Sequence, residues 1–87
     1  MELSFNGELD LHFFSPADTD HLIISFIDES CSAGLRHIRI IHGKGRSAKK
    51  RRLYEILNAD PRIESFSDDS GNWGATLITL KPETPDQ

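Results

Sequence analysis

The stretch from Ser15 to Gly34 carries the start and stop signals of a helix, and it stands between two stretches patterned as strands. Ser15 is a favourable N-cap, Pro16 takes the first helical position, and Asp18 follows three residues after the cap. Gly34 suits a left-handed helix stop. We therefore expect a helix over residues 16–32. Its core-facing stripe consists of Leu22, Ile23, Phe26 and Ile27.

The stretches on either side of this helix have strand character. Residues 8–14 read ELDLHFF, an alternation that places Leu9, Leu11 and Phe13 on one face. Residues 35–43 read LRHIRIIHG and are rich in β-branched side chains. A strand, a helix and a second strand in succession predict a right-handed βαβ unit with parallel strands.

The second half of the chain adds one more helix and two more strands. A helix is expected from about Ser47 to Leu57, a strand over residues 62–66, a turn over residues 67–72 and a strand over residues 73–81. The apolar stripe of this helix consists of Leu53, Ile56 and Leu57. The order βαβαββ predicts an α/β fold, a two-layer sandwich in which two helices cover one face of a four-stranded mixed sheet.

Size and composition fit one small domain. The chain has 87 residues, of which 37% are hydrophobic, so we expect a single domain over residues 8–81. Residues 1–7 are expected to be a flexible N-terminal segment and residues 82–87 a disordered tail. No apolar run approaches the roughly 18 residues of a membrane span, and no secretory signal is visible. Because Cys31 is the single cysteine, no internal disulfide can form. Together with the missing membrane span and secretory signal, this predicts a cytoplasmic protein without a membrane partner.

The net charge of −4 hides a strong asymmetry. Six of the ten basic residues fall within residues 44–52, and the rest of the chain holds four basic and 14 acidic residues. One basic patch on an acidic body predicts one anion-binding surface. The patch consists of Lys44, Arg46, Lys49, Lys50, Arg51 and Arg52.

Asp10 and His12 are the first candidates for chemistry. They stand two residues apart in a predicted strand, so their side chains leave the same face. A carboxylate beside an imidazole fixes the tautomer of the ring and makes it a better general base. The alternative is an ordinary polar pair on a solvent-facing edge.

His42 ends the second predicted strand. If the first two strands are parallel, His12 and His42 both lie near the carboxyl ends of strands, where open α/β sheets bind ligands. Two histidines there could act as base and acid in phosphodiester cleavage. The alternative is a strand-terminal histidine that bonds the adjacent loop.

The turn after His42 has the composition of a phosphate-binding turn. Gly43, Lys44 and Gly45 join a strand to a helix start, where free N–H groups favour an anion, and Arg46 adds charge. The spacing is not that of a nucleotide-binding P-loop, and a simple turn remains the alternative.

Two further features could contact nucleic acid. The basic run from Lys49 to Arg52 covers one turn of the second helix and could meet a phosphate backbone, or form an ordinary solvated face. Trp73 could stack on a base, or pack locally.

Three sequence segments together resemble the Smr (small MutS-related) domain family. They are LDLH at residues 9–12, IHGKG at 41–45 and GNWGATLITL at 71–80, in that order. The resemblance implies a nucleic-acid-binding domain, and several family members are endonucleases that nick DNA or cleave RNA, including messenger RNA on stalled ribosomes. The implied partners are therefore DNA or RNA, and the ribosome.

Carried over residue by residue, the resemblance implies a site. Its members are Asp10 and His12 from the first motif, His42, Gly43 and Gly45 from the second, and Gly71, Gly74, Ala75 and Thr76 from the third. Phe13 and Asn72 replace glycines that are usual in the family, and Lys49 stands where an apolar residue is common.

These residues predict an endonuclease, a phosphodiester hydrolase or transesterase. His12, oriented by Asp10, would act as base, and His42 or Lys44 would stabilise charge or protonate the leaving oxygen. Mg²⁺ on Asp10 is the one cofactor left open, and no second nearby carboxylate is evident to join it. The alternatives are a non-catalytic module that binds nucleic acid or the ribosome, and a protein-interaction domain.

Overall fold

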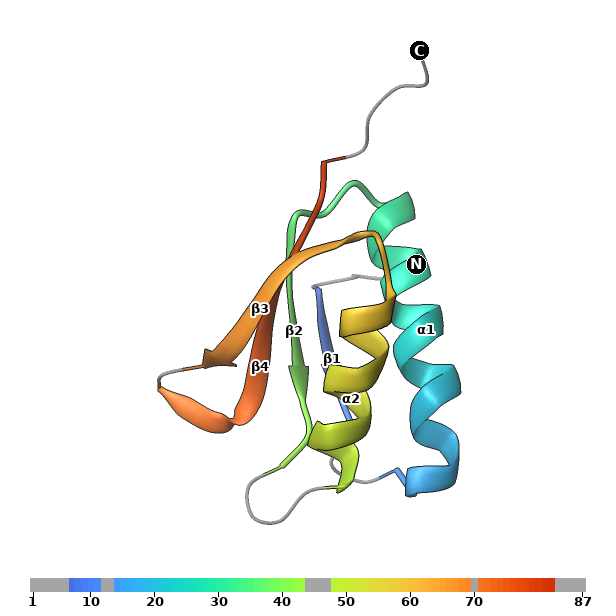
Figure 1. The fold of residues 1–87 in the computed structure, drawn as a ribbon, viewed down its shortest axis with the longest axis vertical. Helices are drawn as coiled ribbons and strands as arrows, with labels where there is room; N and C mark the ends of the chain where they lie inside the picture. The colour runs from blue at the N-terminus through green and yellow to red at the C-terminus, as the bar shows by residue number, and fades with distance from the viewer. Residues whose placement is uncertain (1–6, 12–13, 44–47, 70, 83–87) are drawn as a thin grey trace, which may run out of the picture.

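A computed structural model describes residues 7–11, 14–43, 48–69 and 71–82 (Figure 1). Over these residues the order is βαβαββ, as predicted. The elements are β1 (Glu8–Asp10), α1 (Pro16–Ser32), β2 (His37–Ile41), α2 (Ala48–Ala59), β3 (Ile63–Asp69) and β4 (Asn72–Leu80). No helix in this part of the chain is long and apolar enough to cross a membrane.

The four strands form one mixed sheet in the order β1-β2-β4-β3. β1 and β2 are parallel, whereas β4 is antiparallel to both β2 and β3. The helices α1 and α2 lie side by side on one face of the sheet (Figure 1). The predicted two-layer α/β sandwich is therefore confirmed.

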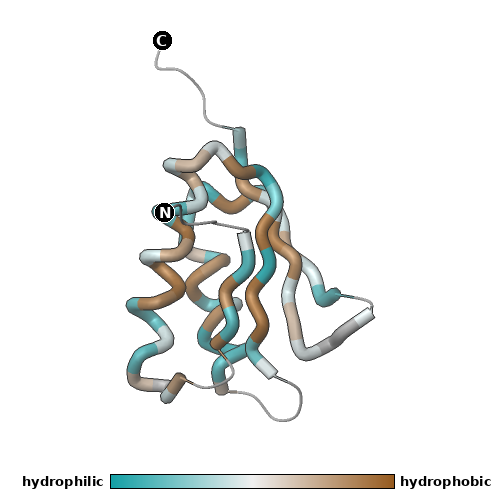
Figure 2. The backbone as a smooth tube through the Cα atoms, turned by 180° about the vertical axis from the view of Figure 1, so that it is seen from behind, coloured by the Kyte–Doolittle hydropathy of each residue, from teal (hydrophilic) through white to brown (hydrophobic). Residues whose placement is uncertain are grey.

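The core lies between the helices and the sheet. Along the first four residues of β2, hydrophilic and hydrophobic residues alternate (Figure 2), since one face of the strand meets the helices. The largest apolar side chains that are fully or nearly fully buried are Leu11, Ile23, Phe26, Ile27, Ile38, Ile40, Leu53, Leu57, Ile78 and Leu80. The predicted stripes of both helices supply half of this core, and the rest comes from β2, β4 and Leu11, which directly follows β1.

β1 is shorter than the predicted strand over residues 8–14. It ends at Asp10, because the Phe14 N–H donates to the Leu11 carbonyl at 3.0 Å and turns the chain toward α1. His12 and Phe13, which the prediction placed in this strand, lie outside the described residues. Of the expected flexible ends, residues 1–7 and 82–87, all but Gly7 and Pro82 lie outside them as well.

The hairpin turn predicted over residues 67–72 was wrong in extent. β3 continues to Asp69, with Asp68 paired to Thr76 and Asp69 paired to Asn72 across the ladder. The polar composition of this stretch is typical of a turn. Here it reflects an edge strand whose carboxylates bond neighbouring side chains, so composition alone gave the wrong boundary.

Candidate functional site

Backbone hydrogen bonds hold the three motif segments together at one end of the sheet. The Leu11 N–H donates to the Ile41 carbonyl at 2.8 Å, which joins the first motif to the second. The N–H groups of His42 and Gly43 both donate to the Gly74 carbonyl, each at 2.9 Å, which joins the second motif to the third. Both helices begin at this end of the molecule (Figure 1).

Asp10 and His42 leave the sheet on opposite faces. Asp10 pairs with Ile41 in the parallel register, so its exposed side chain points to the face that the helices leave open. His42 is one residue further along and points toward the helix layer, where Thr76 contacts its ring. The structure therefore does not bring these two predicted site residues together.

His42 is buried, with 4% of its surface exposed. Its Nε2 lies 2.9 Å from the Thr76 hydroxyl oxygen, and its Nδ1 lies 3.1 Å from the Gly43 carbonyl oxygen. Burial lowers the pKa of His42 below its ordinary value, and the bond to Gly43 opposes this shift without cancelling it. The ring is therefore neutral at pH 7. Its geometry corresponds to the alternative of a strand-terminal histidine that bonds the adjacent loop.

Gly43 supplies conformation to the turn. Its φ is +96°, a value that side-chain-bearing residues rarely adopt. Its N–H is taken by Gly74 and its carbonyl by His42, so neither group faces a ligand. Lys44, Gly45 and Arg46, the other predicted phosphate-binding residues of the turn, lie outside the described residues.

The two lysines of the basic run have different roles. The Lys49 ammonium donates to the Leu11 carbonyl at 2.9 Å, which ties the first turn of α2 to the end of the first motif. The Lys50 ammonium lies 3.1 Å from the carboxylate of Asp68 on β3. Each lysine therefore fastens α2 to a different part of the sheet.

The two arginines differ more sharply. Arg52 donates from Nε and Nη2 to both oxygens of Asp20 on α1, at 2.8 and 2.9 Å, and from Nη1 to Glu55 at 2.8 Å. The hydrogen bond from Arg52 holds the pKa of Asp20 below its usual value. Arg51 is exposed and makes no hydrogen bond or ion pair with any described residue. Of the four, Arg51 is the cation best placed to meet an external anion.

The open face beside Asp10 carries paired charges. Arg39, in the middle of this face, bonds Glu8 on β1 and reaches Asp69 on β3 at 3.1 Å. Those two bonds raise the pKa of Arg39. No group of three metal-binding side chains occurs among the described residues.

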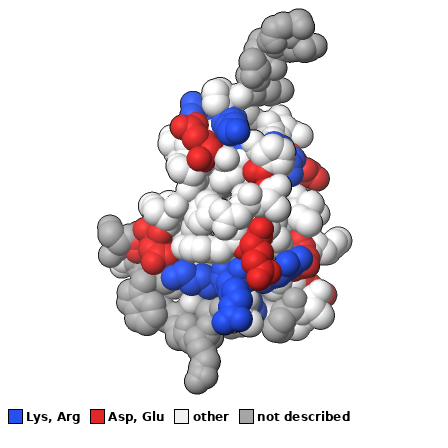
Figure 3. Space-filling model, in the orientation of Figure 1, with Lys and Arg blue, Asp and Glu red and all other residues white. Residues whose placement is uncertain are grey.

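The charged side chains on the surface gather in two groups. In the view of Figure 3, Lys and Arg side chains gather low on the helix layer, with acidic side chains on both sides of them. A second, smaller basic group lies at the other end of the molecule. Trp73 belongs to β4, and its predicted contact with a base stays a prediction.

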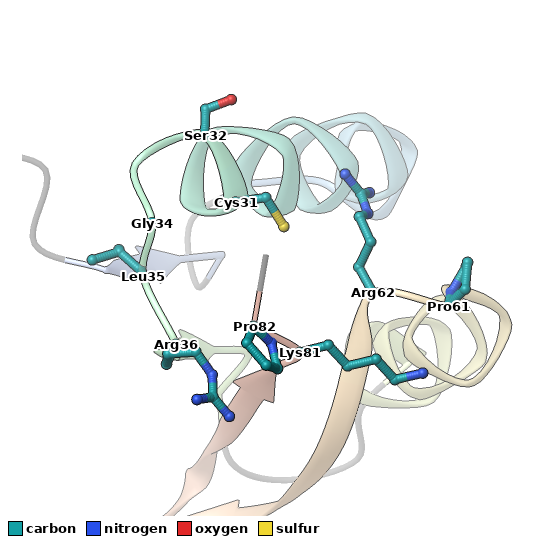
Figure 4. Close-up of a pocket in the computed structure, with 9 residues that line it drawn as sticks. All are labelled: Cys31, Ser32, Gly34, Leu35, Arg36, Pro61, Arg62, Lys81 and Pro82. Carbon is teal, nitrogen blue, oxygen red and sulfur yellow. The ribbon is translucent and has the colours of Figure 1, made fainter. Parts of the chain in front are cut away.

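A cavity of about 420 Å³ lies at that other end (Figure 4). The Cys31 sulfur points toward it, whereas the Ser32 hydroxyl points away. No sequence-predicted site residue lines this cavity. Its lining consists of Cys31, Ser32, Gly34, Leu35, Arg36, Pro61, Arg62, Lys81 and Pro82.

Two residues that contact the site were missed by the sequence. Tyr54 on α2 donates to Asp68 on β3 at 2.7 Å, and its hydroxyl lies 3.5 Å from that of Thr76, which bonds His42. Asp68 was assigned to a turn, and Tyr54 lay in the second predicted helix without a role of its own. One feature of the sequence could have pointed to this contact. Thr76 is a polar residue at a position of β4 that the alternation of the strand places on the buried face.

Comparison with known proteins gives concordant matches. The Smr domain family model matches residues 9–81. Endonuclease MutS2 of Carboxydothermus hydrogenoformans is 33% identical over 81 residues, which cover 90% of this chain and 10% of that protein. Endonuclease MutS2 of Thermus thermophilus is 33% identical over 78 residues, with 86% and 10% covered. The chain thus spans about a tenth of the length of these relatives.

Solved structures agree with the sequence relatives. The Smr domain of Thermus thermophilus MutS2 superimposes with a TM-score of 0.82 at 32% identity, covering 88% of this chain and all of that one. YdaL, a stand-alone small MutS-related protein from Escherichia coli, gives 0.74 at 27% identity, with 86% and 64% covered. With its sequence motifs, its fold and its backbone-linked motif segments in agreement, the chain belongs to the Smr domain family.

Proposed function

We propose that this domain binds nucleic acid where β1, β2 and α2 meet, and cleaves phosphodiester bonds there. One observation carries the proposal most. The backbone bonds from Leu11 to Ile41 and from Gly43 to Gly74 gather the three family motifs at one end of the sheet, beside the start of α2. The relatives named Endonuclease MutS2 support the choice of reaction.

The chemistry is divided among the residues at this end. The start of α2 places the positive end of the helix dipole at this point, which favours a phosphate. Arg51, which pairs with no described residue, adds a cation. His12, oriented by Asp10, takes the proton of a ribose 2′-hydroxyl or of a water, and the resulting oxygen attacks phosphorus. Because both ring nitrogens of His42 are engaged within the fold, we assign protonation of the leaving oxygen to Lys44.

A cleavage assay tests this assignment. Labelled RNA and supercoiled plasmid are incubated with the protein, with and without EDTA, beside Asp10→Asn and His12→Gln. We expect either substitution to slow cleavage by about 10²-fold or more, the usual size of general acid–base help. Glu29→Gln removes one exposed carboxylate from the far half of α1 and should leave the rate unchanged. Absence of cleavage, or equal rates in all variants, would refute the catalytic proposal.

A non-catalytic binding module is the second candidate, because the buried, internally bonded His42 fits a scaffold as well as an active site. This candidate predicts salt-sensitive binding without turnover. Binding to RNA, DNA and purified ribosomes, measured beside the cleavage assay, separates the two candidates and identifies the partner.

Arg51→Gln and Arg52→Gln form a matched pair for the binding surface. Removing one cation that neutralises a phosphate makes the slope of log affinity against log salt shallower by about 0.7 to 0.9. We expect that change for Arg51→Gln. For Arg52→Gln we expect an unchanged slope, since Asp20 and Glu55 already occupy the guanidinium. Equal slopes for both variants would place the phosphate contact elsewhere.

A further inference from the structure

A chain of side-chain contacts leads from His42 to the protein surface. His42 Nε2 lies 2.9 Å from the Thr76 hydroxyl, which lies 3.5 Å from the Tyr54 hydroxyl. Tyr54 donates to Asp68 at 2.7 Å, and the Asp68 carboxylate pairs with Lys50. Within this chain of contacts Thr76 is fully buried, whereas Asp68 is exposed to solvent. It links β4, α2 and β3 behind the second motif.

The hydrogens of this chain can be assigned from chemistry. The Gly43 carbonyl can only accept, so in the neutral ring of His42 the hydrogen lies on Nδ1. Nε2 must then accept from the Thr76 hydroxyl. The Tyr54 hydroxyl hydrogen is directed to the Asp68 carboxylate. Every polar group around the ring is thereby satisfied, and no described buried side-chain atom lacks a partner.

A protonated ring would require one rearrangement. Nε2 would donate to Thr76, and Thr76 would rotate its hydrogen toward the Tyr54 oxygen, while Tyr54 kept its bond to Asp68. The chain therefore supports both protonation states of His42. The charged groups that act on the ring are Asp68, which favours the imidazolium, and Lys50, which disfavours it.

Packing alone does not require these hydroxyls. The Tyr54 ring makes an edge-to-face contact with Phe66 at 4.8 Å between centroids, which a phenylalanine would make as well. Thr76 sits at a fully buried position of β4, where valine has the same shape and needs no hydrogen bond. The Thr76 hydroxyl therefore serves the histidine directly, and the Tyr54 hydroxyl can serve it through Thr76.

We propose that Thr76 is a positioning residue that holds His42 with its Nδ1–H on the Gly43 carbonyl, and so fixes the turn of the second motif, and that Tyr54 and Asp68 support the protonated form of the ring through Thr76. The placement of the turn is independent of any activity. Its consequence for cleavage rests on the proposed function, because the turn precedes the residues assigned to the phosphate.

Nitrogen-15 NMR of the histidine ring tests the placement without nucleic acid. We expect His42 in the native domain to show a protonated Nδ1 and an unprotonated, hydrogen-bonded Nε2 at pH 7. In Thr76→Val the Nε2 resonance should move to that of a nitrogen without a donor, and hydrogen exchange at Gly43 should accelerate. Thr76→Ser keeps the hydroxyl and should restore both signals. Native-like signals in Thr76→Val would overturn the proposal.

Titration of the same resonances tests the outer members of the chain. We expect the His42 midpoint to fall in Tyr54→Phe and in Asp68→Asn, because the imidazolium loses its support, and to rise in Lys50→Gln. A packing role for Tyr54 alone would leave the midpoint unmoved, and that result would remove Tyr54 and Asp68 from the proposal.

The cleavage assay then connects placement to function. We expect Thr76→Val to lower kcat about tenfold with little change in KM, the size of one missing hydrogen bond, and Thr76→Ser to recover it. If the NMR signals change as expected and no variant cleaves, the proposed function fails and the positioning role stands. If cleavage is present and the ring signals are insensitive to Thr76→Val, the positioning role fails.

Discussion

At the scale of single residues, the Gly74 carbonyl is the point that organises the site. One oxygen accepts the N–H groups of both His42 and Gly43, so the third motif fixes the start of the second through backbone alone. The co-occurrence of the two motifs in the sequence thus has a physical cause. Among the side chains, the pair of His42 and Thr76 and the bond from Lys49 to the Leu11 carbonyl add to this frame.

Gly43→Ala should destabilise the domain by about 1–2 kcal/mol, because a Cβ disfavours the positive φ of +96° that the turn requires. Gly71→Ala is the matched control. Its φ is not positive, and the nearest atom to an added Cβ is a side-chain oxygen of Asp69 at 3.7 Å. Urea denaturation followed by circular dichroism measures both. Equal losses would show that conformation is not what Gly43 supplies.

His42 should make stability depend on pH in a defined window. Because burial lowers its pKa in the folded state below the ordinary value of 6.5, the unfolded chain binds a proton first as the pH falls. The free energy of unfolding should therefore decrease as the pH drops below about 6.5, and level off below the folded pKa. Urea midpoints between pH 5 and pH 8 measure this decrease.

His42→Gln should flatten that part of the curve, whereas His21→Gln, at an exposed position of α1, should leave it intact. Carboxylates such as Asp60, whose pKa is lowered from 3.8, act in a separate and more acidic window. A slope that persists in His42→Gln would assign it to another group.

At the scale of elements, the sequence predicted α1 without error in its bounds, because cap, proline and stop residues mark both ends of that helix. The face of each strand residue was predictable only within one strand. Whether Asp10 and His42 share a face depends on the register between β1 and β2, which no local pattern encodes. The partners of the basic run were missed for the same reason, since Asp20 and Arg52 meet only after α1 and α2 pack together.

Arg62 joins three elements near the end of α2. It contacts Asp60 through two nitrogens, at 3.0 and 2.9 Å, and Asp28 on α1 at 2.6 Å. These bonds lower the pKa of Asp60. The arginine thereby connects α1, the end of α2 and the start of β3.

Arg62→Met should cost about 1–2 kcal/mol at neutral pH, because it removes charge-assisted bonds to a mostly buried carboxylate while keeping the aliphatic stem. The difference from the native protein should shrink as the pH falls below the ordinary Asp value of 3.8, since protonated Asp60 no longer pairs. Urea midpoints at pH 7 and pH 3 measure it. Arg51→Met is the control and should change stability by less than about 0.5 kcal/mol. An equal loss in both variants would contradict the stabilising role of the bonds from Arg62 to Asp60 and Asp28.

At the scale of the whole molecule, charge is arranged by end and by face. The net charge is −4, so a nucleic acid is repelled by most of the surface and attracted only where cations are unpaired. The open face carries Asp10 and the paired group around Arg39. The basic residues beside the distal cavity include Arg36 and Arg62, both paired with carboxylates. The start of α2, with Arg51, is therefore the approach that we propose for a nucleic acid.

NMR titration with a short single-stranded RNA or a DNA duplex tests this approach. We expect amide shifts over Ala48–Arg52, because a phosphate bound at the helix start polarises these N–H groups, and none at Leu35 or Lys81 beside the distal cavity. The shifts should diminish as salt is raised. Arg51→Gln should reduce them, and Arg52→Gln, which removes the same charge from an arginine already paired with Asp20 and Glu55, is the charge-matched control. Shifts centred on the distal cavity would assign binding to another surface and would refute the proposed site, whatever the outcome of the cleavage assay.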